Sequence, residues 1–90
     1  MSVRIVNRST RDKTFAKRML AVIPMVEEIL FEPDWIEVSP DHTVAWLGYY
    51  EYDGERTIDY VLQIHGYNVY IYNVASDGGT GVYQGEFKLI

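Results

Sequence analysis

The spacing of apolar residues changes once along this chain, near Pro33, and this change restricts the folds that the chain can adopt. Before Pro33, apolar residues recur at steps of four, three, four and three, as on one face of a helix. These residues are Phe15, Met19, Val22, Val26 and Ile29. After Pro33 the sequence carries short runs of β-branched and aromatic residues, which are typical of strands. One helix must therefore cover whatever sheet the rest of this 90-residue chain forms.

The predicted helix has a clear start and an interrupted middle. Ser9, followed three residues later by Asp12, fits an N-terminal capping box. Pro24 cannot donate the backbone hydrogen bond that a helix interior requires. Either the helix bends there, or one helix ends near Val22 and a second begins with Pro24 in its first turn. Because the apolar spacing continues across Pro24, we favour a single bent helix over roughly residues 10–31.

Strand-forming segments follow the helix. They are WIEV, HTVAWLGYYEY, RTIDYVLQIH, NVYIYNV and VYQGEFKLI, and the residues around Val3 and Ile5 could add a short strand or an arm. We predict a single domain over residues 1–90, of the α+β class. In it, one bent N-terminal helix packs on one face of an antiparallel meander sheet of four or five strands. The other face of the sheet is left to solvent or to a partner.

The register of the hairpin around Asp53 and Gly54 decides which face carries the aromatic residues. A two-residue Asp53-Gly54 turn pairs Tyr49 with Ile58 across the hairpin. In this register the side chains that point away from the helix include Trp46, Tyr50 and Tyr52.

A three-residue loop with a bulge is the alternative. It shifts the pairing by one residue, so that every cross-strand partner changes face and Trp46 enters the core. It also places Glu51 opposite Glu55, where two like charges repel. We therefore favour the two-residue turn.

The chain contains more aromatic side chains than one helix can cover. It has eight tyrosines, two tryptophans and three phenylalanines. Tyrosines can lie flat on a sheet with their hydroxyl groups in water, but tyrosine and tryptophan are also enriched where proteins bind other proteins. The candidate partner-binding residues are Trp46, Tyr50, Tyr52, Glu51, Asp53, Glu55 and Asp59.

The net charge of −5 hides an uneven distribution. Residues up to Arg18 include six basic residues and one acidic residue, Asp12, which gives this segment a charge of +5. The residues from Met19 onward include two basic and twelve acidic residues, and hence carry a charge of −10. An acidic surface of this kind favours encounter with a basic partner.

Nucleic-acid binding is the second hypothesis. The N-terminal segment could contact phosphates, and aromatic residues of the sheet could stack on bases. The candidate residues for this role are Arg4, Arg8, Arg11, Lys13, Lys17 and Arg18. The charge of −10 on the rest of the chain opposes this role, because it repels a long polyanion.

The two histidines, His42 and His65, carry the third hypothesis, a small metal-binding protein or enzyme. The two-residue turn would set them opposite each other, with Asp41 adjacent. Two cross-strand histidines supply only half of a tetrahedral site, so we expect no metal and no other cofactor. No pair of carboxylates is marked for acid–base chemistry, and we predict no catalytic residues and no enzymatic activity.

The favoured function is that of a non-catalytic protein-binding module with an acidic, aromatic-rich sheet face for a basic partner protein. An inhibitor or antagonist of a nucleic-acid-handling enzyme would fit, as would a viral anti-defence protein or an antitoxin. A homodimer through the spare face or an open sheet edge is an alternative assembly. The lack of cysteine, and of an apolar run after the first basic residues, predicts a cytoplasmic protein without membrane association.

Overall fold

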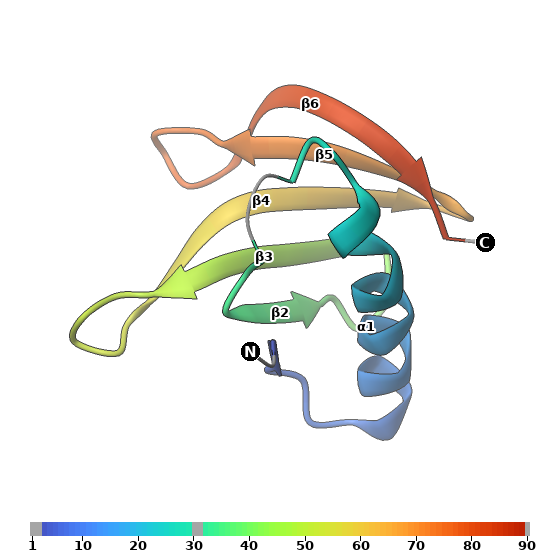
Figure 1. Cartoon of the computed structure of the whole chain (residues 1–90), viewed down its shortest axis with the longest axis horizontal. Helices are drawn as coiled ribbons and strands as arrows, with labels where there is room; N and C mark the ends of the chain where they lie inside the picture. The colour runs from blue at the N-terminus through green and yellow to red at the C-terminus, as the bar shows by residue number, and fades with distance from the viewer. Residues whose placement is uncertain (1–2, 30–31, 90) are drawn as a thin grey trace.

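The computed structural model places one helical layer on one face of a six-stranded sheet (Figure 1), and it describes residues 3–29 and 32–89. The elements along the chain are β1 (Arg4–Ile5), α1 (Thr10–Val22), the 3₁₀ helix η1 (Ile23–Met25), β2 (Trp35–Val38), β3 (Val44–Tyr50), β4 (Arg56–His65), β5 (Asn68–Val74) and β6 (Thr80–Lys88). This arrangement confirms the predicted α+β class. No helix in these residue ranges combines the length and the apolar character that crossing a membrane requires.

The strands lie in the sheet in the order in which they occur in the chain. β2 to β6 form the predicted antiparallel meander. β1 pairs in parallel with β2, with Arg4 beside Trp35 and Ile5 beside Ile36. Parallel neighbours need a long crossover connection, and α1 and η1 lie in the connection between β1 and β2. The sheet has more strands than the predicted four or five because β1 adds a two-residue strand at one edge.

The start of α1 is set by its capping residue. The Ser9 hydroxyl accepts a hydrogen bond from the Asp12 backbone N–H at 3.1 Å, as the sequence predicts. In a full capping box the Asp12 carboxylate would accept from the Ser9 backbone N–H; here it accepts a hydrogen bond from His42. The helix therefore begins where predicted, and its first turn is tied to the connection between β2 and β3.

The helical segment ends earlier than predicted. α1 stops at Val22, η1 follows, and Val26 is already extended, with φ −93° and ψ 114°. One helical segment is present, as predicted, but its predicted extent over residues 10–31 is wrong at the C-terminal end. The last two residues of that range, 30–31, lie outside the described residues. The physical reason is Pro24, which has no N–H to donate within a helix, so the chain tightens into a 3₁₀ turn and then leaves the helix.

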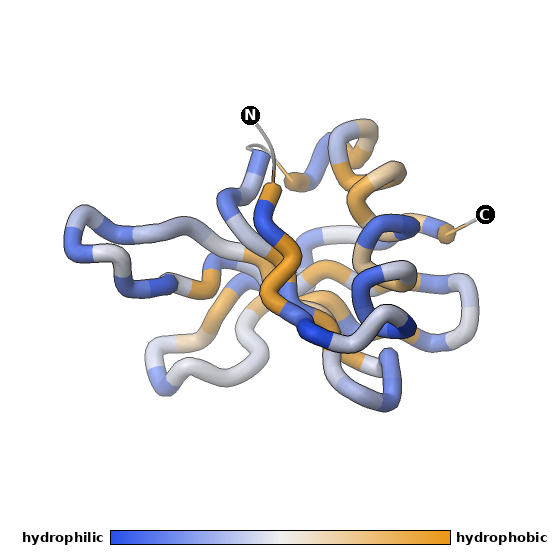
Figure 2. The backbone as a smooth tube through the Cα atoms, turned by 90° about the horizontal axis from the view of Figure 1, so that it is seen from below, coloured by the Kyte–Doolittle hydropathy of each residue, from blue (hydrophilic) through white to orange (hydrophobic). Residues whose placement is uncertain are grey.

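The apolar stripe of this segment still meets the sheet after the helix has ended. Val26 N–H donates to the Ile23 carbonyl at 3.0 Å and Ile29 N–H to the Val26 carbonyl at 3.2 Å, so a buried residue recurs every third position. These three residues, Ile23, Val26 and Ile29, join Ala16 and Met19 in covering one face of the sheet. The sheet residues beneath them with no exposed surface are Ile36, Ala45, Leu47, Leu62, Val69 and Ile71. Figure 2 shows hydrophobic stretches gathered in the middle of the molecule and hydrophilic ones at the loops. Because burying one large aliphatic side chain contributes about 1.5–3 kcal/mol, this one-sided core is the main source of stability.

The inner half of the β3–β4 hairpin has the predicted register. Leu47 lies opposite Tyr60, and Trp46 lies opposite Val61. Leu47 belongs to the core under α1, and neighbouring residues of a strand point to opposite faces. Trp46 therefore points away from the helical layer, as predicted.

The outer half of the hairpin has the alternative register, so the predicted two-residue turn at Asp53 and Gly54 is wrong. The Glu51 N–H donates to the Glu55 carbonyl at 2.7 Å across a three-residue loop, in which Gly54 takes a positive φ of 87°. The facing glutamates, which we expected to disfavour this loop, both have exposed side chains. Solvent therefore screens their repulsion.

A bulge divides the two halves of the hairpin. Gly48 pairs with Ile58, not with Asp59, which is the extra residue on β4. A Cβ at position 48 would overlap the backbone carbonyl of Thr57 and would lie 3.0 Å from Trp35 Cζ2. The close approach of these strands therefore requires a glycine at position 48.

Replacing Gly48 by alanine is expected to destabilise the protein by about 3 kcal/mol, because the new Cβ meets backbone that is held in the β3–β4 pairing. Urea denaturation measures the change in the free energy of unfolding. Gly79→Ala is the control: its Cβ would meet only the exposed Asp77 side chain, at 3.3 Å. A loss below about 1 kcal/mol is expected for that variant. Equal stability of the wild type and Gly48→Ala would contradict the described approach of the strands.

Candidate protein-binding surface

The sheet face that the helical layer leaves uncovered carries a row of paired side chains. The successive partners from β2 to β6 are Glu37, Trp46, Val61, Tyr72 and Tyr83. Directly paired residues share a face of the sheet, so all of them lie on the side opposite to α1. We call the surface around this row the open face.

The aromatic residues of the open face pack on one another. Val61 is only 4% exposed, although no helix among residues 3–29 and 32–89 covers it, because it lies between Trp46 and Tyr72. The rings of Tyr72 and Tyr83 meet edge to face with their centroids 5.8 Å apart. Tyr83 is 49% exposed, while Trp46 and Tyr72 are half-buried, so solvent and other molecules can reach the row.

A second row lies beside the first. Gln63, Tyr70 and Glu86 are partners on β4, β5 and β6. The Tyr83 hydroxyl donates to Glu86 Oε1 at 2.9 Å, and this hydrogen bond to the protonated phenol raises the pKa of Tyr83. His65 meets the Tyr70 ring edge-on, with centroids 5.5 Å apart. These contacts restrict the motion of the Tyr83 and Tyr70 rings.

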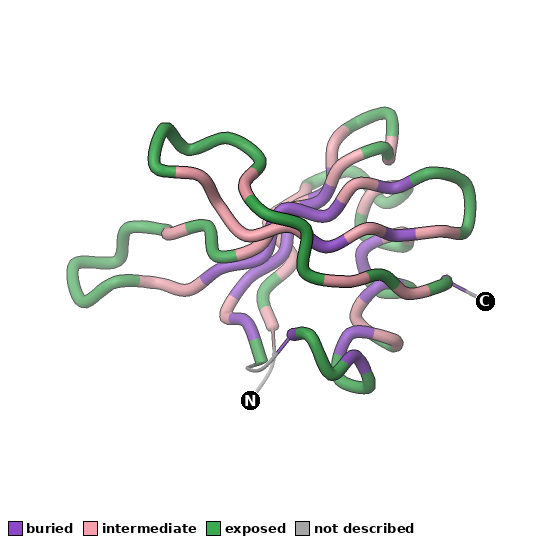
Figure 3. The backbone as a smooth tube through the Cα atoms, turned by 90° about the horizontal axis from the view of Figure 1, so that it is seen from above, coloured by how far each residue is buried: buried purple, intermediate pink, exposed green. Residues whose placement is uncertain are grey.

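The tip of the β3–β4 hairpin extends beyond the rest of the sheet at the left of Figure 1, and it is exposed (Figure 3). Tyr52 has a fully exposed side chain. The Asp53 carboxylate accepts a hydrogen bond from the Glu55 N–H at 3.1 Å, which helps to order the loop. The tip therefore presents one tyrosine among exposed carboxylates.

The predicted partner-binding residues lie in two adjoining regions. Trp46 lies on the open face, and strand alternation places Tyr50 there as well. The exposed tip and the bulge behind it carry Tyr52, Glu51, Asp53, Glu55 and Asp59.

Sequence reasoning missed the tyrosines of β5. Tyr70 and Tyr72 alternate with Val69 and Ile71, which are fully buried under the helical layer. This alternation is a signal that could have placed both tyrosines on the open face.

Strict alternation along β6 would place Tyr83 on the same face as Phe87 and Leu89, which pack on the core. Tyr83 instead pairs with Tyr72 on the open face, because the β5–β6 register shifts on both sides of Tyr72.

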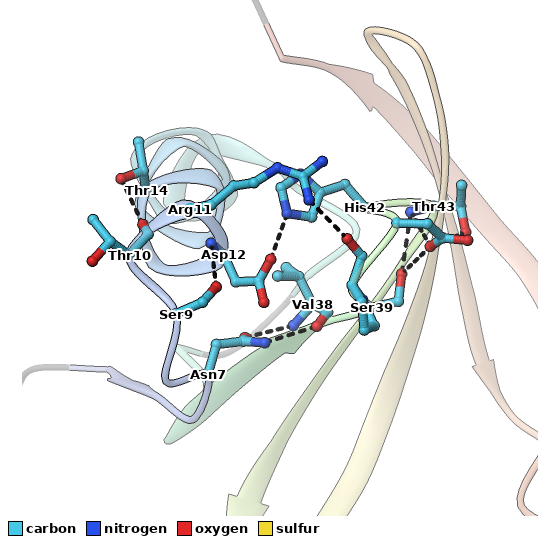
Figure 4. Close-up of polar contacts among 12 residues, drawn as sticks. Asn7, Ser9, Thr10, Arg11, Asp12, Thr14, Val38, Ser39, His42 and Thr43 are labelled. Carbon is cyan, nitrogen blue, oxygen red and sulfur yellow. Dashed lines mark hydrogen bonds and ion pairs between the residues drawn. The ribbon is translucent and has the colours of Figure 1, made fainter.

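The two histidines do not form the predicted cross-strand pair. His42 has a positive φ of 59°, and its ring faces α1 (Figure 4). Its Nε2–H donates to Asp12 Oδ1 at 2.7 Å, and its ring stacks on Phe15 with centroids 4.3 Å apart. His65 lies on the opposite side of the sheet, against Tyr70. Within residues 3–29 and 32–89, no group of three or more His, Cys, Asp or Glu side chains could hold a metal ion.

The Asp12–His42 pair joins the helix to the β2–β3 connection. The hydrogen bond from His42, followed by one from the Ser9 hydroxyl, lowers the pKa of Asp12. The nearby Ser39 hydroxyl donates to Asp41 at 2.7 Å and not to His42. The Asp12–His42 hydrogen bond thus links α1 to the connection between β2 and β3.

Asp41 organises the connection itself. Its Oδ1 accepts hydrogen bonds from the Ser39 hydroxyl at 2.7 Å, the Thr43 hydroxyl at 2.8 Å and the Thr43 N–H at 3.1 Å. These hydrogen bonds lower the pKa of Asp41 to about 2. The carboxylate is thus used in local structure.

The basic residues of the N-terminal segment lie on different sides of the helical layer. A helix turns by about 100° per residue, so Arg11 and Arg18 lie along one side of α1 and Lys13 and Lys17 along another. Arg11 also donates to the Pro40 carbonyl at 3.3 Å. The remaining two candidates, on β1 and in its connection to α1, are the exposed residues Arg4 and Arg8. The helix and the open face lie on opposite sides of the sheet, so the basic residues of α1 and the aromatic rows cannot contact one nucleic-acid strand from the same side.

Comparisons with protein-family models, with curated proteins and with solved structures find no match to this chain.

Asp41→Ala is expected to destabilise the protein at neutral pH and to lose much of that effect in acid. The pKa of Asp41 is lowered from 3.8 to about 2 in the folded state, so the ionised carboxylate stabilises the fold above about pH 3.8. This contribution is lost as the pH falls through about 2. Urea midpoints of the wild type and the variant, measured between neutral pH and pH ~2, check this. A gap between the midpoints that does not narrow in acid would contradict it.

Proposed function

We propose that this protein is a non-catalytic protein-binding module that presents its open face and hairpin tip to a basic partner protein. The observation that carries the proposal is the aromatic row of Trp46, Tyr72 and Tyr83 on a face that the helical layer leaves uncovered. A contiguous exposed apolar patch is typical of interaction sites, and tyrosine and tryptophan are enriched among the residues that dominate binding energy.

The size of the open face suits a stable complex. The molecule measures 35 × 30 × 24 Å along its principal axes. A typical specific complex buries about 800 Å² on each partner. One broad face of this molecule has room for such an area, with the hairpin tip at its border.

The charge of the hairpin tip indicates the kind of partner. Glu51, Asp53 and Glu55 are exposed together on the loop, with Asp59 on the bulge behind them. Arg56, the one basic residue of this hairpin, has its guanidinium 3.0 Å from the Glu37 carboxylate. The tip therefore attracts a positively charged surface, which speeds encounter and orients the approach.

Surfaces that bind nucleic acid are rich in lysine and arginine. A nucleic-acid-handling enzyme is therefore the partner class that fits best, and the protein would act as its inhibitor or antagonist by occupying the basic groove. A viral anti-defence protein or an antitoxin would have this kind of role, by analogy of charge and shape.

Combined replacement of Trp46, Tyr50 and Tyr52 by alanine is expected to weaken partner binding at least ~100-fold while the domain stays folded, because central aromatic anchors each contribute about 2 kcal/mol or more. Affinity capture from the native host with mass spectrometry identifies the partner, and calorimetry then measures the affinity. Tyr67→Ala is the matched control, since Tyr67 is 63% exposed but lies in the β4–β5 turn. Undiminished binding by the triple variant would refute the proposal.

Neutralising the acidic residues of the tip is expected to slow association about tenfold at low salt and to leave dissociation nearly unchanged. The changes are Glu51→Gln, Asp53→Asn, Glu55→Gln and Asp59→Asn. Surface plasmon resonance with the identified partner, at low and at high salt, separates the two rates. An association rate that responds neither to salt nor to these changes would show that charge does not steer the encounter.

A further inference from the structure

A shallow hollow of about 320 Å³ lies on the open face at the base of the β3–β4 hairpin. Gly48 is paired with Trp35 on β2 and with Ile58 on β4. Because glycine has no side chain, the space between the Trp35 and Ile58 side chains is left open. The residues that line the hollow are Trp35, Glu37, Trp46, Arg56 and Ile58. Two indoles, a carboxylate and a guanidinium therefore surround one open space.

Trp35 forms the floor of this hollow. Its Nε1–H donates to the Tyr49 carbonyl at 3.2 Å, which fixes the orientation of the ring. Trp35 is only 2% exposed, although it lies on the face opposite to the helical layer. Arg56 covers it: the guanidinium carbon lies 4.7 Å from the centroid of the indole.

Arg56 is held over Trp35 by contacts that are easily broken. Its Nη1–H donates to Glu37 Oε1 at 3.0 Å, but the side chains of Arg56 and Glu37 are 40% and 37% exposed. Ion pairs with this degree of exposure are weak, because water competes for both charges. Rotation of Arg56 away from the sheet would uncover an indole face and a carboxylate side by side.

We propose that the hollow binds an arginine side chain of the basic partner, and that Arg56 occupies the site until the partner arrives. This inference rests on the proposed function and identifies the residue type that the partner inserts. The incoming guanidinium takes the two contacts that Arg56 makes, stacking on Trp35 and hydrogen bonding to Glu37, while Trp46 supplies a second indole wall. Arginine suits the site better than lysine, because its planar guanidinium can stack on an indole and bind a carboxylate through two parallel hydrogen bonds.

A peptide titration tests the site without the partner. The probe is acetyl-Gly-Arg-Gly-amide, compared with the corresponding lysine and citrulline peptides, and NMR follows the indole N–H signals of Trp35 and Trp46. Arg56→Gln is expected to bind the arginine peptide about tenfold more tightly than the wild type, because the internal competitor is gone. Adding Glu37→Gln to that variant is expected to reduce the affinity to that of the citrulline peptide.

Three results would overturn the arginine site. They are equal or weaker binding by Arg56→Gln, equal affinity for the lysine and arginine peptides, and shifts confined to the hairpin tip. If Arg56→Gln fails to fold, Arg56→Lys takes its place, because lysine keeps an alkyl chain over Trp35 and a charge for Glu37 but loses the planar stack. The same order of affinities with a smaller gain is then expected.

The two proposals fail in distinguishable ways. Partner binding that requires Trp46, Tyr50 and Tyr52, together with peptide titrations that show no binding, would refute the arginine site and leave the proposed function standing. Arginine binding in the hollow, together with partner binding that the triple variant retains in full, would refute the proposed function alone.

Discussion

Burial of one apolar stripe against one face of a sheet holds this molecule together. Met19, Ile23 and Val26 lie on that stripe and have counterparts such as Leu47 and Leu62 across the core. The stripe runs along a single helical segment and the residues just after it, and within the described residues no second layer covers the other side of the sheet. The aromatic residues of that side must therefore pack on one another or on a partner. The open face is a direct result of building a domain of this size from one helical segment and a six-stranded sheet.

The parts of the fold that depend on local chemistry could be predicted from the sequence. A serine in front of an apolar stripe indicates a helix start, and alternation within β3 indicates the side on which Trp46 lies. The parts that were missed depend on contacts between distant residues. The glycine at position 48 leaves room for the Trp35 ring from another strand, and His42 turns toward Asp12, thirty positions away in the chain. No window of neighbouring residues contains such information.

The candidate surface was predictable in character but not in extent. The hairpin is recognisable in the sequence because its aromatic and acidic residues are adjacent, whereas β5 and β6 contribute theirs only after the sheet has formed. Val61 shows what this assembly achieves: it is almost fully buried on a face that has no second layer. Tyrosines that simply lay flat on a sheet would also shield their neighbours, so burial alone does not distinguish a solvated face from a binding face. The acidic tip beside the rings is the feature that favours a binding face.

The two edge strands of the sheet, β1 and β6, affect whether a protein with an exposed aromatic face pairs with copies of itself. β1 offers only two paired residues, and β6 departs from regular pairing at two places near Tyr72. Short and irregular edges are poor templates for adding further strands, which is how many β proteins avoid fibrous aggregation. Edges of this kind disfavour strand-to-strand pairing between copies of this chain, so the aromatic face can stay uncovered without the sheet extending from one molecule to the next.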